Sequence, residues 1–393
     1  MTDDDHKQLK PRADNLPAAL QRSKQLLALS ANIRARTQAL ATADDGWFER
    51  LCAWADEFDI PEEELPREKA KLLAMTELGI RRSVYSNSPF KDYPKLIRLA
   101  AEISCLGNLQ TLDLWDNQLT DLPDSIGQLG NLQELDLSYN QLIALPDAIG
   151  QLGNLQMLDL SFNQLTALPD SIWQLGNLQL LDLCDNQLTA LPDAIGQLSN
   201  LQTLRLLGNQ LTILPAAIGQ LGNLQTLRLL GNQLTDLPAA IGQLGNLQTL
   251  VLDRNQLTTL PAAIGQLGNL QELNLWNNQL AALPAAIGQL GNLQTLDLSC
   301  NQLTALPDEI WQLGNLQTLD LSCNQLTTLP TAIGQLESLQ ELDLRSNPLT
   351  ALPTSLKRLY CERNGALEIK LNNYLLLEYD DEAFSSFDDD TPF

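Results

Sequence analysis

Hydrophobic and polar residues follow one phrase that returns every 23 residues through most of this chain. One copy runs from Leu132 to Pro146 and places leucines in the order Leu-x-x-Leu-x-Leu ahead of Asn140. The alternation at Leu135 and Leu137 predicts a short strand with one buried face. A fixed period of this length is typical of a solenoid, in which each unit buries its apolar face only against its neighbours.

An asparagine follows each predicted strand at the same place in eleven copies, with no insertion or deletion between them. Its amide can both donate and accept hydrogen bonds. A column of inward-facing amides would therefore satisfy the backbone of the turn that leaves each strand, and we interpret this asparagine as structural. The eleven residues are Asn117, Asn140, Asn163, Asn186, Asn209, Asn232, Asn255, Asn278, Asn301, Asn324 and Asn347.

The second half of each repeat predicts a short helical segment. Leu145 returns to the core, and Pro146 fits a first helical position because the proline ring fixes φ. Ile149 and Leu152 are three residues apart and share one helical face. Gly153 is expected to take the left-handed conformation that ends a helix.

The phrase is similar to the leucine-rich repeat, in the 23-residue class with Leu-Pro-x-x-Ile-Gly-x-Leu that occurs in intracellular Ras-group leucine-rich proteins and Roco proteins. The resemblance covers Leu109 to about Leu352. It implies an α/β fold, namely a curved right-handed solenoid with a parallel β-sheet on the concave face and short helices or 3₁₀ turns outside. Eleven strands about 4.8 Å apart would make that face about 50 Å long.

The pattern divides the chain into five parts. They are a helical N-terminal region and cap over 1–74, a degenerate first repeat over 75–108, eleven repeats over 109–355, a truncated last repeat and C-terminal cap over 356–379, and an acidic tail over 380–393. In the degenerate repeat, Met75–Ile80 matches the strand and Leu99–Asn108 the helical part, with a loop at Val84–Lys95 between them.

The N-terminal part predicts three helices, at Asn15 to about Ala41, around Trp47–Phe58, and at Glu62–Leu73. In the second, four apolar residues form one helical stripe, which we interpret as packing on the first repeat; a separate docking helix is the alternative. They are Trp47, Leu51, Trp54 and Phe58.

At the other end, Leu356–Asn364 matches a twelfth strand that follows a shortened convex segment. Cys361 would lie at a core position of this strand and act as a small hydrophobe. The shorter repeat resembles those of bacterial effectors delivered into host cells.

The formal net charge is −24, and residues 109–355 carry 22 acidic and 4 basic residues. Nucleic-acid binding by the repeats is disfavoured because phosphate contacts need clustered Lys and Arg, and an anionic membrane surface would repel this array. No apolar run is long enough for a transmembrane helix, and the acidic start is unlike a signal peptide. The scattered cysteines favour a reducing compartment, so we expect a cytoplasmic protein.

Cys300 and Cys323 hold the same position in adjacent repeats, so their Cα atoms should lie about 5 Å apart. That separation permits a disulfide. We favour two free thiols because no other feature indicates oxidation.

Catalytic motifs are scarce. The single histidine, His6, argues against histidine-based triads and zinc sites. The phosphate-binding Gly-x-x-x-x-Gly-Lys-Ser/Thr loop of the Roco GTPase is absent. Too few residues follow the last predicted strand for the ubiquitin-ligase domain that such effectors often carry. We therefore predict no enzyme, catalytic residue, metal or cofactor.

The concave positions between the strand leucines carry the variable chemistry. Aspartate fills this column in most repeats, as is common in the family, but Arg205, Arg228 and Val251 interrupt it. Exposed aromatic and arginine side chains are enriched in interface hot spots. We predict that a partner contacts Trp115, Tyr139, Phe162, Arg205, Arg228, Arg254 and Trp276.

Trp173 and Trp311 replace the convex glycine of the Ile-Gly-Gln-Leu segment, which we interpret as packing or surface variation.

Together these features predict a monomeric, non-enzymatic protein-interaction scaffold in a bacterial or otherwise cytosolic setting. One alternative is an effector exported into a host cell, which would still bind through the array. Another is an enzyme with its site in the first 100 residues. A third is recent duplication with little selection on the surface, since one phrase occurs verbatim from Gly291 and from Gly314.

Overall fold

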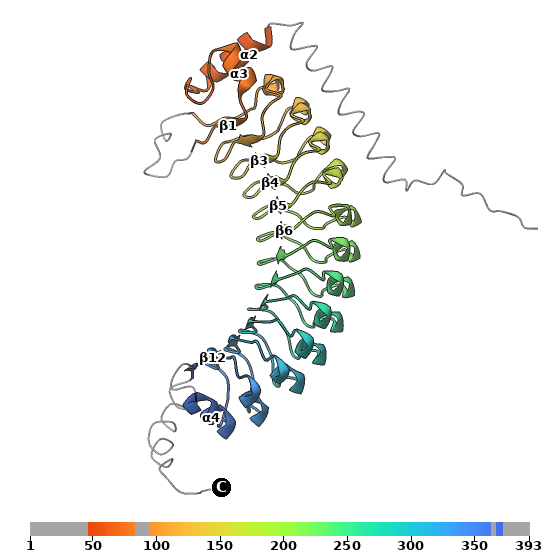
Figure 1. The fold of residues 1–393 in the computed structure, drawn as a ribbon, viewed down its shortest axis with the longest axis vertical. Coiled ribbons are helices and arrows are strands. Elements are labelled where there is room, and N and C mark those ends of the chain that lie inside the picture. The colour runs from red at the N-terminus through yellow and green to blue at the C-terminus, as the bar shows by residue number, and fades with distance from the viewer. Residues whose placement is uncertain (1–45, 83–93, 363–366, 372–393) are drawn as a thin grey trace, which may run out of the picture.

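The computed structural model describes residues 46–82, 94–362 and 367–371. Within them, one parallel sheet of thirteen strands lines the inner curve of a solenoid, and 3₁₀ turns line the outer curve (Figure 1). The strands lie in chain order, and each pairs in parallel with the next. The predicted curved α/β solenoid with a parallel sheet on its concave face is therefore confirmed.

Each strand has three residues, with the middle side chain in the core. The strands are β1 (Glu77–Gly79), β2 (Thr111–Asp113), β3 (Glu134–Asp136), β4 (Met157–Asp159), β5 (Leu180–Asp182), β6 (Thr203–Arg205), β7 (Thr226–Arg228), β8 (Thr249–Val251), β9 (Glu272–Asn274), β10 (Thr295–Asp297), β11 (Thr318–Asp320), β12 (Glu341–Asp343) and β13 (Glu368–Lys370).

The convex segments are 3₁₀ turns of five residues. They are η1 (Ala101–Cys105), η2 (Asp124–Gln128), η3 (Asp147–Gln151), η4 (Asp170–Gln174), η5 (Asp193–Gln197), η6 (Ala216–Gln220), η7 (Ala239–Gln243), η8 (Ala262–Gln266), η9 (Ala285–Gln289), η10 (Asp308–Gln312) and η11 (Thr331–Gln335). The position predicted for proline was one residue off. Pro146 has ψ 148° and precedes η3 as its N-cap, where its carbonyl accepts the Ile149 N–H at 3.0 Å.

The left-handed conformation predicted for Gly153 was wrong, because positive φ falls instead on the residue before each ladder asparagine. There the chain must turn sharply out of the strand so that the asparagine points inward. Non-glycine residues pay a steric cost for this conformation. The residues are Asp116, Tyr139, Phe162, Asp185, Gly208, Gly231, Arg254, Asn277, Cys300, Cys323 and Ser346.

The asparagine ladder is confirmed in detail. The Oδ1 of Asn140 accepts the backbone N–H of Leu119 in the preceding repeat at 3.0 Å. Its Nδ2 donates to the carbonyls of Leu114 and Leu137, both at 3.0 Å. Each amide thus joins two repeats through backbone groups that are buried from water, and the same bonds recur along the array.

A helical cap closes the N-terminal end of the array. Helix α2 (Gly46–Glu57) buries the predicted stripe, whose members Trp47, Leu51, Trp54 and Phe58 are at most 5% exposed. The Nε1 of Trp54 donates to the carbonyl of Arg98 at 3.1 Å, and α2 packs on η1. The stripe therefore packs on the first repeat, as predicted.

Two further N-terminal predictions had different outcomes. Helix α3 (Lys69–Ala74) is shorter than the predicted Glu62–Leu73 segment. The predicted helix at 15–41 and most of the predicted loop at 84–95 lie outside the described residues.

The predicted twelfth strand at Leu356–Asn364 was wrong. Thr354–Glu362 is an α-helix, α4, which buries Leu356 and Leu359 against η11, and Cys361 lies in this helix. Leucines three residues apart suit a helical face as well as the start of a Leu-x-x-Leu strand. The final parallel strand is β13, which pairs with β12 and places Ile369 opposite Leu342.

Candidate functional site

The third residue of each strand faces the concave side, and in most repeats it is an aspartate with a structural task. The Oδ1 of Asp136 accepts the backbone N–H of Ser138 at 2.9 Å, and Asp159 does the same for Ser161 at 2.9 Å. Such carboxylate-to-backbone bonds stabilise a turn. The aspartate column is thus explained by folding.

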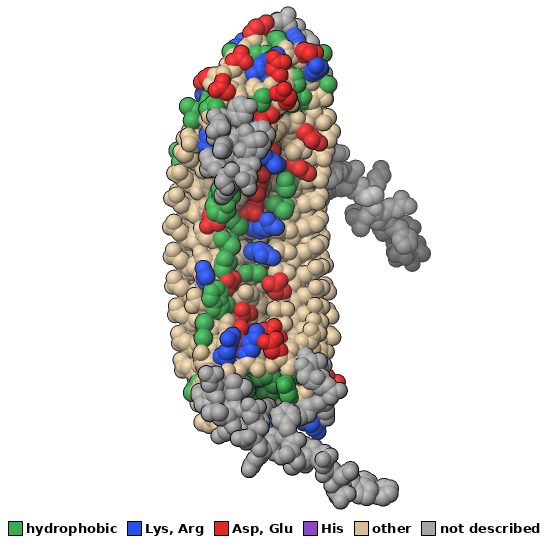
Figure 2. All heavy atoms as spheres, turned by 90° about the vertical axis from the view of Figure 1, so that its left-hand side faces the viewer, with side chains coloured by type: hydrophobic (Ala, Val, Ile, Leu, Met, Phe, Trp, Pro, Cys, Tyr) green, Lys and Arg blue, Asp and Glu red, His purple; other side chains and the backbone are tan. Residues whose placement is uncertain are grey.

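Four adjacent strands lack this aspartate; β9 ends in Asn274, whose Oδ1 still accepts the backbone N–H of Trp276, but the other three end in residues without a side-chain acceptor. Strands β6, β7 and β8 end in Arg205, Arg228 and Val251, and in-register pairing places these three side by side. Val251 is buried, whereas both arginines are exposed. Figure 2 shows basic side chains in the middle of the concave face with acidic ones to either side along the array. The break in the aspartate column thus places two arginines side by side near the middle of the concave face.

The two arginines differ in their surroundings. Arg205 Nη1 lies 3.1 Å from Asp182 Oδ2, whose carboxylate is nearly buried. Arg228 forms no ion pair within the part of the chain that the structure describes. Arg228 is therefore the arginine whose charge is available to a ligand.

The three predicted aromatics form one continuous stack across consecutive repeats. The ring centroids of Tyr139 and Phe162 are 4.1 Å apart with an interplanar angle of 16°, and Trp115 meets Tyr139 edge-on at 5.9 Å. Tyr139 is 37% exposed and Phe162 41% exposed, and both have positive φ. Bulky side chains in a strained conformation on an open surface contribute little to a core, so folding alone does not account for them.

Arg254 and Trp276 form a second pair. The Arg254 guanidinium lies 4.7 Å from the centroid of the Trp276 ring, a cation–π arrangement. Trp276 is half-buried, and its backbone N–H donates to Asn274 Oδ1 at 2.9 Å. No contact joins this pair to the aromatic stack within the described residues, since repeats carrying Asp182 and the two central arginines lie between.

Two glycines that the sequence analysis did not single out lie in the repeats of Arg205 and Arg228. Gly208 and Gly231 are the two glycines with positive φ among the described residues, and they stand in the two repeats that carry Arg205 and Arg228. The signal was the identical run Arg-Leu-Leu-Gly-Asn, which occurs from Arg205 and from Arg228.

Asp253 is a second omission. It is 5% exposed, its Oδ1 has no hydrogen-bond partner within the described chain, and burial raises its pKa. Val251 cannot supply the carboxylate that caps this position in other repeats.

Desolvation makes part of the aspartate column sensitive to pH. Burial raises the pKa of Asp159 above its ordinary 3.8, and the Asp182 and Asp136 carboxylates raise it further. In the folded protein Asp159 keeps its proton at a pH where the unfolded chain has lost it, so stability falls as pH rises through the window just above 3.8.

We expect Asp159→Asn to raise the free energy of unfolding at pH 7 by roughly 1 kcal/mol for each carboxylate repulsion removed. Asn keeps the Oδ1 acceptor, as Asn274 shows with the Trp276 N–H. Urea unfolding between pH 4 and 7 measures the effect, with the exposed Asp147→Asn as a control of equal charge change. A gain in Asp147→Asn equal to that in Asp159→Asn would contradict the assignment to this column.

No disulfide forms among the cysteines whose side chains the structure describes, namely Cys52, Cys105, Cys184, Cys300 and Cys323. The Cys300 N–H donates to the Ser322 carbonyl at 2.9 Å, which brings Cys300 beside Cys323. Burial raises the pKa of Cys300, and the neighbouring Cys323 thiol raises it further. Cys300 and Cys323 are therefore neighbouring thiols and do not form a disulfide in this structure.

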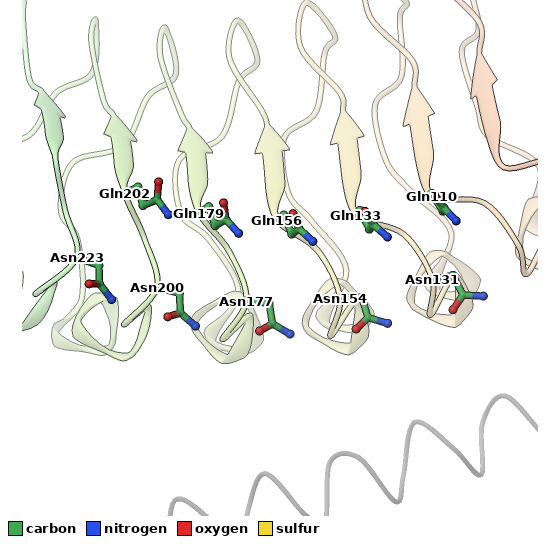
Figure 3. A pocket seen from close by; sticks show the side chains of 10 residues that line it. All are labelled: Gln110, Asn131, Gln133, Asn154, Gln156, Asn177, Gln179, Asn200, Gln202 and Asn223. Carbon is green, nitrogen blue, oxygen red and sulfur yellow. The ribbon is translucent and has the colours of Figure 1, made fainter.

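A groove of about 690 Å³ lies away from the strand face, where the chain passes from each 3₁₀ turn into the next strand (Figure 3). The Asn131 Nδ2 donates to the Gly107 carbonyl at 2.7 Å, and Asn154 repeats this bond to Gly130 at 2.7 Å. The groove is a neutral amide ladder without titratable groups, so we place the candidate site on the concave face. Its lining residues are Gln110, Asn131, Gln133, Asn154, Gln156, Asn177, Gln179, Asn200, Gln202 and Asn223.

Two searches of the described residues found nothing. No group of three or more His, Cys, Asp or Glu side chains there could hold a metal ion. Among the helices of the same residues, none has the length and apolar character needed to cross a membrane.

Family models described as leucine rich repeat match residues 107–165, 153–211 and 291–349. A leucine-rich repeat region model matches 204–279, and a model of two repeat copies matches 268–309. A search of curated proteins finds no match.

Solved structures with the same fold include a leucine-rich repeat protein of Leptospira interrogans, 42% identical with a TM-score of 0.70, over 80% of this chain and 82% of that one. An internalin of Listeria monocytogenes is 22% identical with a TM-score of 0.59, over 77% and 88% of the two chains, and shows the fold alone. The Drosophila Toll–Spatzle complex is 28% identical with a TM-score of 0.62, over 71% of this chain but 38% of that one.

Proposed function

Because the chain belongs to the leucine-rich repeat family, we propose that it is a non-enzymatic scaffold that binds a protein partner along its concave strand face. A solenoid of this kind offers an extended concave surface, and such surfaces commonly serve in binding. The similar structure of Toll in complex with Spatzle supports a protein as the ligand.

The observation that carries the proposal is the aromatic cluster of Trp115, Tyr139 and Phe162, in which Trp115 is half-buried and the stacked rings of Tyr139 and Phe162 are exposed. Tyr139 and Phe162 adopt a conformation that glycine or asparagine would take at lower cost. Rigid aromatic surface loses little entropy on binding, and aromatic residues dominate interface hot spots. A partner that covers the stack would therefore gain affinity there.

Arg205, Arg228 and Arg254 extend the proposed surface along the next repeats. Arg228 lacks a carboxylate partner within the described residues, and the Arg254 guanidinium is held over Trp276. An array with a net charge of −18 over residues 109–355 repels acidic partners at long range. The arginines would consequently select a partner with a local, well-placed acidic or aromatic group.

We further propose a bacterial, cytoplasmic, monomeric protein. The 42% identity with the Leptospira interrogans protein supports a bacterial setting. The free thiols at Cys300 and Cys323 support a reducing compartment. Export into a host cell remains the alternative, and detection of a tagged chain in host cytosol would favour it.

The test is crosslinking and pull-down from the native cell with the wild-type chain, followed by affinity measurement on the captured partner. Arg205→Glu with Arg228→Glu should abolish binding, and Arg228→Glu alone should weaken it without altering thermal stability, because Arg228 is exposed and forms no ion pair within the described residues, whereas Arg205 pairs with Asp182. Tyr139→Ala with Phe162→Ala should weaken binding by at least tenfold.

The control is Gln220→Glu with Gln243→Glu, which adds negative charge at exposed convex positions. It should bind like the wild type. A partner that binds all of these variants equally well would rule out the concave face.

A further inference from the structure

The two repeats with arginine in place of aspartate leave a backbone N–H group without its usual acceptor. Elsewhere the strand carboxylate accepts the N–H two residues further on, as Asp136 does for Ser138 and Asp297 for Ser299, both at 2.9 Å. The corresponding donors in the arginine repeats are the N–H groups of Leu207 and Leu230. Neither forms a hydrogen bond within the described residues.

The same repeats carry glycine where other repeats carry a side chain. Gly231 has a φ of 68°, and a Cβ placed on it would meet only the Gly208 backbone, at 3.7 Å or more. The surface beside the Leu230 N–H is therefore open. Beside Gly208 the Asp185 carboxylate fills the space, since its Oδ1 lies 2.4 Å from where a Cβ would be.

The charged side chains near the two donors also differ, and they again favour the Leu230 N–H over the Leu207 N–H as a site for a ligand. Arg205, next to Leu207, already pairs with Asp182. Arg228, next to Leu230, has no ion pair within the described part of the chain. The nearby carboxylate of the following repeat, Asp253, is nearly buried, and Arg254 stands beside it. The Leu230 N–H, which has no acceptor among the described residues, and the exposed Arg228 guanidinium thus form a donor pair with net positive charge.

We propose that the Arg228 repeat binds a carboxylate supplied by the protein partner, an aspartate or glutamate side chain that takes the place of the missing strand aspartate. The carboxylate accepts the Leu230 N–H with one oxygen and pairs with the Arg228 guanidinium through the other. This assignment rests on the proposed concave-face function and specifies the chemistry of its partner.

Two physical features support this occupant. Seven other repeats show that an internal carboxylate satisfies the same backbone donor, so the geometry of a carboxylate at this position is already built into the fold. Hydrogen bonds to a charged acceptor are stronger than neutral ones. Because the whole array is acidic, a partner with one or two carboxylates among neutral residues fits better than a polyanion.

The first test needs no partner. Amide hydrogen exchange of the full chain should show the Leu230 N–H exchanging at least tenfold faster than the Ser161 N–H, which Asp159 binds. In Arg228→Asp the restored internal carboxylate should slow Leu230 exchange to the Ser161 rate. Equal protection of both amides in the wild type would overturn the proposal.

The second test uses a defined probe, an acetylated and amidated peptide with two glutamates among glycines, in low salt. Adding it to the ¹⁵N-labelled chain should shift the Leu230 amide resonance, and the glutamine version of the peptide should not. Arg228→Gln should weaken binding at least tenfold, and Arg228→Asp should abolish it because the site is then filled internally. Equal shifts with both peptides, or undiminished binding by Arg228→Asp, would contradict the assignment.

Failure of this inference is distinguishable from failure of the proposed function. If the captured native partner loses affinity for Tyr139→Ala with Phe162→Ala but not for Arg228→Asp, the concave scaffold stands and the carboxylate assignment falls. If the glutamate peptide binds as expected while the native partner ignores every concave variant, the proposed function falls instead.

Discussion

Asn163→Ala is expected to lower the free energy of unfolding by about 2–4 kcal/mol, because a buried backbone N–H loses its acceptor and two buried carbonyls each lose one of their donors. Asn163 Oδ1 accepts the Leu142 N–H at 2.9 Å, and its Nδ2 donates to the carbonyls of Leu137 and Leu160, both at 3.0 Å. Those carbonyls keep the amides of Asn140 and Asn186 as donors, whereas the Leu142 N–H is left without a partner. The Asn163 side chain is 7% exposed, so water has little access to this N–H. Urea unfolding of the full chain measures the loss.

The chain offers a matched control for this prediction. Asn154 also donates to the preceding repeat, to the Gly130 carbonyl at 2.7 Å, but it is exposed. Water can replace its bond, so Asn154→Ala should cost less than about 1 kcal/mol. If both variants lost equal stability, the ladder would owe its strength to something other than the burial of its hydrogen bonds.

Trp173→Gly is expected to cost about 3–5 kcal/mol, although glycine is the commonest residue at this position of the repeat. Where glycine is present, consecutive turns nearly touch, since a Cβ on Gly150 would lie 2.4 Å from the Ser171 carbonyl oxygen. Trp173 is 1% exposed. Its indole therefore fills space between turns, and its removal leaves a cavity.

Trp173→Phe is the conservative variant. The Nε1 of Trp173 has no hydrogen-bond partner among the described residues, so loss of the indole N–H removes a desolvation cost and offsets part of the lost packing. We expect this variant to retain most of the stability. Wild-type stability in Trp173→Gly would show that the turns close up on the glycine, as they do elsewhere in the array.

Both predictions depend on features that the sequence showed only in part. The period identified the ladder asparagines and their inward direction, because ten identical spacings between eleven asparagines admit one register of the sheet. The tryptophans were visible as departures from the phrase, yet packing and surface variation were both open. The structure buries both Trp173 and Trp311, so their role is packing.

The ends of the array were harder to predict than its middle. Leu356 and Leu359 fit the start of another Leu-x-x-Leu strand, but they lie in α4 and cover η11. Helix α4 comes between β12 and β13 and covers the apolar face of η11, and β13 rather than α4 pairs with β12. The sequence pattern gives the spacing of the apolar residues, but it does not show which apolar face another element must cover.

For the candidate site, too, the sequence determined some features and the tertiary structure determined others. Sequence alone determined the solenoid, the concave position of Tyr139, Phe162 and Arg228, and the break in the aspartate column, since these follow from a period of 23 and alternation within each strand. Only the tertiary structure stacked Tyr139 on Phe162, paired Arg205 with Asp182 and left the Leu230 N–H without an acceptor among the described residues. Those outcomes depend on contacts between repeats and on side-chain direction, which a one-dimensional period does not contain.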